Sequence, residues 1–254
     1  MLSPDVSKPP IKVLILQCRE LVDPMLDHEI ECIVKKFKNT PTQVDIHNVI
    51  ASPPTEDLLD IDALIIGGSG AYSVHHEEIQ HWVKPTCAFI EKALKKSLPG
   101  FGICFGHQLV GQVLGSKVVT SSEHTEIGTV ELDLTAEGKS DPVFGHLPKR
   151  FTAQTGHSDH VQTIPHGTTL MAKGSLLDTQ AFKVEDAKFY STQFHPDMTG
   201  AQARERYMAY HHKLQAVTPK ATPEEAKRFE LNRDDACALL GFFIDDVAEG
   251  STPS

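Results

Sequence analysis

The 254-residue sequence has no long hydrophobic run and no excess of basic charge. No apolar segment approaches the roughly 20 residues that a membrane helix needs, which argues against a membrane protein. The formal net charge is −10, whereas proteins that bind nucleic acids or anionic membranes usually carry basic patches. We therefore expect neither nucleic acid nor a membrane as a partner.

Cysteine is scarce, and its spacing does not indicate a metal site. The five cysteines include no C-x-x-C pair, the spacing typical of structural zinc sites and redox motifs. A G-x-x-x-x-G-K-[ST] phosphate loop is also missing, so nothing implies ATP. The first ten residues lack the apolar segment of a secretory signal. We predict a cytoplasmic protein without metal or cofactor, with a disordered lead-in at 1–10.

Alternating segment types in the first half predict an α/β fold. Short aliphatic or alternating runs are typical of strands, and the segments between them carry apolar residues at helical spacing. The expected strands are 11–16, 43–49, 62–66 and 99–103, and the expected helices are 25–37, 79–94 and one that begins at Cys104. This order predicts a mostly parallel sheet covered by helices on both faces.

The second half consists of shorter segments. Residues 116–194 contain β-like runs separated by turns, which indicates a small mixed or antiparallel extension of the sheet. A helix is expected at 201–214. We predict one domain over 11–215, followed at 216–254 by a C-terminal extension of two helices and a frayed tail; the first of these helices is expected to begin at Thr222. The β-like runs are 117–120, 128–134, 168–173, 180–184 and 189–193.

Cys104 lies at a predicted junction between a strand and a helix. Gly102 and Gly106 flank it, as small residues flank the nucleophile of a strand–turn–helix elbow. The positive end of the helix favours thiolate over thiol, and the thiolate is the reactive form. Cys104 is therefore the candidate nucleophile, and the alternative is a buried thiol at the end of a strand.

A cysteine nucleophile needs a base, and the segment Phe194-His195-Pro196-Asp197 offers one. The β-like run before it places His195 at a strand end, and the rigid Pro196 lets Asp197 turn back toward the imidazole. A carboxylate in that position fixes the ring tautomer and stabilises the imidazolium. Most of the other histidines are expected on the surface, and His107, beside the elbow, is expected to pack or to form hydrogen bonds.

These motifs together resemble the class I, or triad-type, glutamine amidotransferases. The matching segments are Gly102-Ile103-Cys104-Phe105-Gly106-His107-Gln108, the His-Pro-Asp corner, and Gly67-Gly68 at the end of a strand. The resemblance covers roughly 11–212 and is nearest to stand-alone members similar to the glutaminase domain of GMP synthase, a group that includes γ-glutamyl peptidases. It implies a flavodoxin-like three-layer sandwich with C-terminal helices.

The resemblance also implies a role for each matching residue. Cys104 attacks the γ-carbonyl of glutamine or of a γ-glutamyl group, and His195, oriented by Asp197, transfers protons. The family usually has Glu at the third position, so the shorter Asp197 must lie nearer to the ring or act through a water. The implied oxyanion donors are the N–H groups of Gly68 and Phe105, and the implied substrate-binding residues are Gly67, Gln108, His157, Ser158 and Asp159.

Several functions remain open from the sequence. A glutaminase subunit would take a small-molecule substrate, glutamine, and pass ammonia to a separate synthase subunit, whereas a free-standing γ-glutamyl peptidase would need no partner. A regulatory or binding protein on the same scaffold is the non-enzymatic alternative. A DJ-1-like protein also places a cysteine at an elbow, but the corner at His195 counts against that interpretation.

Overall fold

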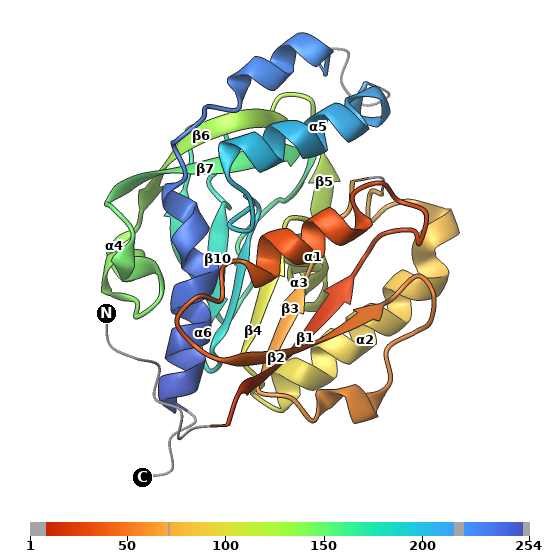
Figure 1. Cartoon of the computed structure of the whole chain (residues 1–254), viewed down its shortest axis with the longest axis vertical. Coiled ribbons are helices and arrows are strands. Elements are labelled where there is room, and N and C mark those ends of the chain that lie inside the picture. Colours follow the sequence, from red (N-terminus) through yellow and green to blue (C-terminus); the bar gives the residue numbers. More distant parts are fainter. Residues whose placement is uncertain (1–8, 71, 216–220, 251–254) are drawn as a thin grey trace.

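A computed structural model describes residues 9–70, 72–215 and 221–250, and its centre is a nine-stranded sheet (Figure 1). The predicted aliphatic runs form a parallel half. Its strands are β1 (Ile11–Gln17), β2 (Thr42–Asn48), β3 (Ala63–Ile66), β4 (Gly100–Ile103) and β11 (Phe189–Thr192). The carboxyl ends of these strands share one edge, where reactive groups gather in such sheets.

The other half of the sheet is antiparallel. It contains β6 (Glu126–Leu134), β7 (Arg150–His157), β9 (Thr168–Lys173) and β10 (Ala181–Val184). The full strand order is β2-β1-β3-β4-β11-β10-β9-β6-β7. A separate two-stranded sheet pairs β5 (Val118–Thr120) with β8 (Asp159–Val161).

Helices cover both faces of the parallel half, which completes the predicted three-layer α/β sandwich. Helices α1 (Leu26–Val34) and α6 (Leu239–Gly250) pack on one face, and α2 (Gln80–Lys95) and α3 (Phe105–Val113) pack on the other. The side chains of β1 contact the two helix layers alternately, because successive side chains of a strand point to opposite faces of the sheet. Ile15 packs in the cluster that includes Phe243 of α6, and Leu16 packs in the cluster that includes Trp82 of α2.

The remaining helices are short or lie beyond the sheet. Helix α5 (Gly200–Leu214) matches the predicted 201–214 and has a capping box at Thr199. Helix α4 (Ala136–Ser140) follows β6. The 3₁₀ helices are η1 (Glu56–Leu59), η2 (Glu77–Ile79), η3 (Phe144–His146), η4 (Pro223–Arg228) and η5 (Asp235–Ala238).

Several parts of the second half differ from the prediction. A helix begins after Thr222 with Pro223 at its first position, as expected, but it is the six-residue 3₁₀ helix η4, and the Thr222 side chain makes no capping hydrogen bond within the described residues. Within residues 221–250, α6 is the only α-helix. Strand β7 was not expected, since its mostly buried residues follow no alternation. The predicted lead-in, apart from Pro9 and Pro10, lies outside the described residues, as does the end of the tail at 251–254. No helix in the described ranges is long and apolar enough to cross a membrane.

Candidate active site

Cys104 lies at a tight turn between β4 and α3. Its φ angle is +52°, in the left-handed region that L residues rarely adopt. The backbone leaves no room beside it: a Cβ at Gly102 would lie 2.9 Å from the carbonyl carbon of Gly106, and one at Gly106 would overlap the carbonyl oxygen of Ile66. The two glycines are therefore required by the close approach of α3 to β3 and β4, as in a nucleophile elbow.

His195 and Asp197 follow β11 and meet at the same edge of the sheet. The backbone N–H of His195 donates to the carbonyl of Gln154 on β7, which fixes the corner. His195 Nδ1 lies 3.0 Å from Asp197 Oδ1, a direct hydrogen bond, so the shorter Asp reaches the ring without a water. Both residues are buried, with exposures of 6% and 1%.

Arg206 on α5 holds the other oxygen of the same carboxylate. Its Nη1 donates to Asp197 Oδ2 at 3.0 Å, and both side chains are buried. Burial raises the pKa of Asp197, but the charges of Arg206 and His195 outweigh this effect and lower it overall. Asp197 is therefore ionised and can hold a protonated imidazole.

The charge on His195 depends on its two neighbours. Burial lowers the pKa of the ring, but the charge of Asp197, and then that of Cys104, outweigh burial and raise the pKa to about 9. The interaction with Cys104 acts on the ring in the same direction, and both residues line the same pocket. His107 behaves in the opposite way: burial, with the charge of His157, lowers its pKa to about 3, and its Nδ1 lies 2.9 Å from the Ser191 hydroxyl. His107 is thus a neutral packing residue.

Gly68 lies directly over the Cys104–His195 pair. A Cβ at this position would lie 3.2 Å from Cε1 of His195 and 3.8 Å from Cβ of Cys104. The N–H of Gly68 donates to Oε1 of Glu29 at 3.0 Å. Phe105 begins α3, so its N–H belongs to the first turn, whose amides have no acceptor within the helix.

Among the residues expected to bind substrate, four line a pocket beside Cys104: Gln108, His157, Ser158 and Asp159. Gln108 Nε2 donates to the Asp159 carbonyl at 3.0 Å, and His157 Nε2 lies 3.1 Å from Glu126 Oε2. Asp159 Oδ1 accepts from the Thr120 hydroxyl, while its Oδ2 has no hydrogen-bond partner within the described part of the chain. The predicted loop at this place is in fact the end of β7 and the start of β8.

Gly67 does not line that pocket. Its N–H continues the sheet by donating to the Leu16 carbonyl at 2.9 Å, and a Cβ there would lie 3.0 Å from Oε2 of Glu29. The structure therefore places Gly67 behind Gly68, against the carboxylate of α1.

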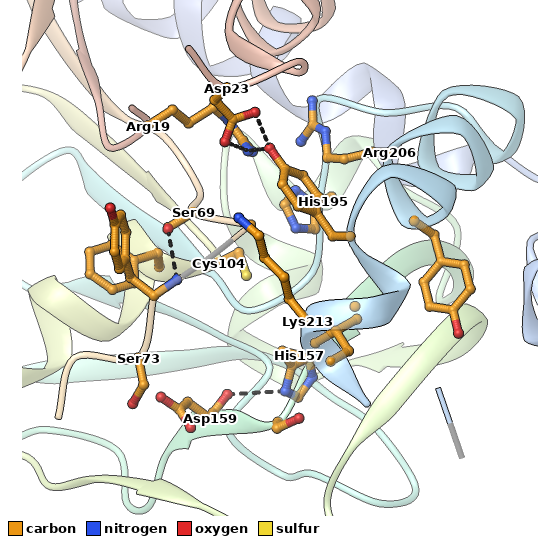
Figure 2. A pocket seen from close by; sticks show the side chains of 18 of the residues that line it. Arg19, Asp23, Ser69, Ser73, Cys104, His157, Asp159, His195, Arg206 and Lys213 are labelled. Atoms are coloured by element: carbon orange, nitrogen blue, oxygen red, sulfur yellow. Dashed lines mark hydrogen bonds and ion pairs between the residues drawn. The ribbon is translucent and has the colours of Figure 1, made fainter. Parts of the chain in front are cut away.

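The pocket has a volume of about 680 Å³, and Cys104 and His195 lie between its two ends. Figure 2 shows Arg19 and Asp23 at one end and His157 and Asp159 at the other. Across residues 9–70, 72–215 and 221–250, no cluster of three or more His, Cys, Asp or Glu side chains could hold a metal ion.

Two charged residues beside Cys104, His195 and Asp197 were not expected from the sequence, namely Arg206 and Glu29. Each lies on the buried face of its helix: Arg206 is four residues before Tyr210, and Glu29 is four residues before Ile33. A charge at a core position of an amphipathic helix was the signal that could have revealed both, because such a charge is rarely buried without a partner.

Known proteins resemble this chain in sequence and in fold. A family model described as "Glutamine amidotransferase class-I" matches residues 25–213. One of the subunits of the glutamine-hydrolyzing GMP synthase of Sulfurisphaera tokodaii is 32% identical over 168 residues, which cover 65% of this chain and 82% of that protein. The protein of the same name from Methanococcus vannielii is 34% identical over 107 residues, 42% of this chain and 54% of its own length.

A solved structure shares the fold. A glutamine amidotransferase from Thermotoga maritima has a TM-score of 0.71 at 21% sequence identity, over 95% of this chain and 100% of that one. This likeness confirms the predicted flavodoxin-like α/β class. Since the family model extends over well more than half of the sequence, from α1 through α5, the chain belongs to the class I glutamine amidotransferases.

Proposed function

We propose that this protein hydrolyses the side-chain amide of glutamine through a thioester on Cys104. Membership of the family supports glutamine amide hydrolysis in general terms. The observation that carries the proposal for this chain is the direct 3.0 Å contact between buried Asp197 and His195, beside Cys104 at the wall of a pocket.

The chemistry follows from the arrangement of charges. The Cys104 thiolate attacks the γ-carbonyl carbon, and the carbonyl oxygen becomes an oxyanion that the N–H groups of Gly68 and Phe105 would stabilise. Protonated His195 gives its proton to the leaving nitrogen, the C–N bond breaks, and ammonia departs. The neutral ring then takes a proton from water, which hydrolyses the thioester to glutamate and frees the thiolate.

The far end of the pocket would hold the amino-acid end of the substrate. Asp159 Oδ2, which has no hydrogen-bond partner among the described residues, can accept from the α-ammonium, with Ser158 and His157 beside it. Gln108 lies on the same helix face as Cys104, one turn later, and can contact the same group. Ammonia would then pass to a separate synthase subunit, and the name of the S. tokodaii relative supports this role.

A second candidate function is cleavage of γ-glutamyl peptides. The observation that favours it is the pocket volume of about 680 Å³, within the roughly 300–1,000 Å³ of sites that hold drug-sized ligands. The space beyond Cys104, toward Arg19 and Asp23, could take a leaving group larger than ammonia.

One assay tests both functions. The purified chain is incubated with glutamine, with glutathione and with a γ-glutamyl dipeptide, alongside Cys104→Ala and, as a matched control, Cys87→Ala, a free cysteine away from the pocket. We expect ammonia from glutamine, lost in Cys104→Ala and kept in Cys87→Ala. Cleavage of the peptides instead would favour the second function. If Cys104→Ala changed no turnover on any substrate, the regulatory or binding protein would be the better interpretation.

A further inference from the structure

The Glu29 carboxylate accepts a hydrogen bond from the backbone N–H of Gly68, which the proposed mechanism needs as an oxyanion donor. The N–H of Gly68 donates to Glu29 Oε1 at 3.0 Å, and the carboxylate is 1% exposed. The adjacent glycine packs against the same group, since a Cβ at Gly67 would lie 3.0 Å from Oε2. Thus both glycines at the end of β3 face a buried acidic side chain from α1.

This contact opposes catalysis if Gly68 serves the oxyanion. A donor acts only when it lies about 2.7–3.1 Å from the developing negative oxygen. Here that donor already binds a full negative charge, and a second anion beside it would be repelled in a buried, weakly screened site. We propose that Glu29 is a positioning residue that holds the Gly68 amide away from the substrate, so that the oxyanion hole is completed only when the carboxylate releases Gly68. The inference rests on the proposed function.

Arg19 holds the carboxylate in place. Its Nη2 donates to Glu29 Oε1 at 3.1 Å, and its Nε lies 3.0 Å from Oε2. Arg19 is 2% exposed, so the pair is shielded from solvent and kept in one geometry. Glu29 cannot leave Gly68 without Arg19 changing its contacts.

The same arginine reaches the substrate pocket. Its Nη1 donates to the Tyr210 hydroxyl at 2.5 Å and lies 3.8 Å from Asp23, and Arg19, Asp23 and Tyr210 all line the pocket. The Tyr210 ring also packs against Gly70, where an added Cβ would overlap it. A substrate that displaces these side chains therefore has a physical route to Glu29, because every link is a direct contact.

Glu29→Gln tests the inference, because it keeps the size of the side chain and removes its charge. A neutral amide oxygen accepts a weaker hydrogen bond from Gly68 and does not repel an oxyanion. Removing one oxyanion donor costs about 10²–10³ in kcat, so we expect kcat for glutamine to rise about ten-fold or more, with KM changed less than about two-fold. An unchanged or lower kcat would overturn the inference. Glu31→Gln, on the exposed side of α1 and paired with Lys35, is the matched control.

Labelling of Cys104 separates this effect from a general structural one. Iodoacetamide alkylates the thiolate without an oxyanion, whereas a chloromethyl ketone analogue of glutamine first adds the thiolate to a carbonyl. Glu29→Gln should accelerate only the second reaction, and equal acceleration of both would contradict the inference. If the wild-type chain showed neither turnover nor ketone labelling that depends on Cys104, the proposed function itself would fail. Wild-type activity without a faster Glu29→Gln variant would overturn the role of Glu29 alone.

The wild-type chain gives a second test that holds even if Glu29→Gln does not fold. The aldehyde analogue of glutamine forms a hemithioacetal with Cys104, whose oxygen occupies the oxyanion position. A crystal structure of this adduct should show the Gly68 N–H bonded to that oxygen and Glu29 moved away. A Gly68 N–H still bonded to Glu29, with the adduct oxygen bound elsewhere, would refute the inference.

Discussion

At the scale of single residues, the proposed mechanism depends on the protonation state of His195. Burial alone would keep the ring neutral, but Asp197, itself held by Arg206, and Cys104 raise the pKa of His195 to about 9. A protonated imidazole next to the sulfur is the form that can give a proton to the leaving nitrogen. The charge of the ring at neutral pH therefore depends on the buried carboxylate of Asp197.

We predict that the Cε1 proton of His195 titrates near pH 9 in NMR spectra and that Asp197→Asn lowers this pKa. Because the folded-state pKa lies above the ordinary 6.5, the charged ring stabilises the fold fully below pH 6.5 and loses this contribution as pH rises through 9. The free energy of unfolding by urea should therefore fall from pH 6.5 to 9.5 in the wild type. The Asp197→Asn variant should lose less over the same range, and a wild-type midpoint near 6.5 would contradict the prediction.

At the scale of elements, the elbow depends on how closely α3 approaches β3. Gly106 is in the first turn of α3, and any side chain there would meet the Ile66 carbonyl, which belongs to the sheet and cannot yield as a flexible side chain can. The position of Cys104 over the sheet edge thus follows from helix packing as well as from its own backbone angles.

Gly106→Ala should destabilise the protein by about 1–3 kcal/mol or more, as expected for overpacking, and should also lower activity by shifting Cys104. Urea unfolding measures the first effect and glutamine turnover the second. Gly156→Ala is a suitable control for stability, because a Cβ there would lie more than 4 Å from the other atoms in the described part of the chain, apart from its chain neighbours. A Gly106→Ala variant as stable as Gly156→Ala would show that α3 can move away from β3.

At the scale of the whole molecule, the C-terminal extension completes the core. Phe243 of α6 is fully buried and packs on Phe101 of β4, with ring centroids 5.5 Å apart. Leu239, Leu240 and Ile244 belong to the same cluster as the β1 and β3 side chains. We propose that residues 11–215, although they contain the whole candidate site, need the extension to cover one face of the sheet.

Phe243→Ala should lower the free energy of unfolding by about 3–5 kcal/mol, the usual cost of emptying a buried aromatic position. Leu231→Ala, in the same extension but 55% exposed, should cost less than about 0.5 kcal/mol. Urea denaturation of both variants checks the difference. Equal stabilities would mean that α6 is not part of the cooperative fold.

The sequence alone determined the parts that depend on local pattern. Aliphatic runs separated by amphipathic segments specify a parallel α/β sheet, because each run is buried on both faces. Gly102 and Gly106 around Cys104, and the corner from His195 to Asp197, mark the candidate site, because turns and strand ends are encoded by neighbouring residues. Strand β7 could not be predicted from local pattern, because almost all of its residues are buried and no alternation of buried and exposed positions marks it as a strand.

Only the tertiary structure decided which charged side chains contact the residues of the candidate site. Arg19 meets Tyr210 across 191 residues, and Glu29 meets Gly68 across 39. Whether a charged side chain points to solvent or into the core depends on the partner that folding brings to it, since a buried charge is tolerated only when paired. A sequence states that Glu29 and Arg206 are charged, and only the packed fold places one on the Gly68 amide and the other on Asp197.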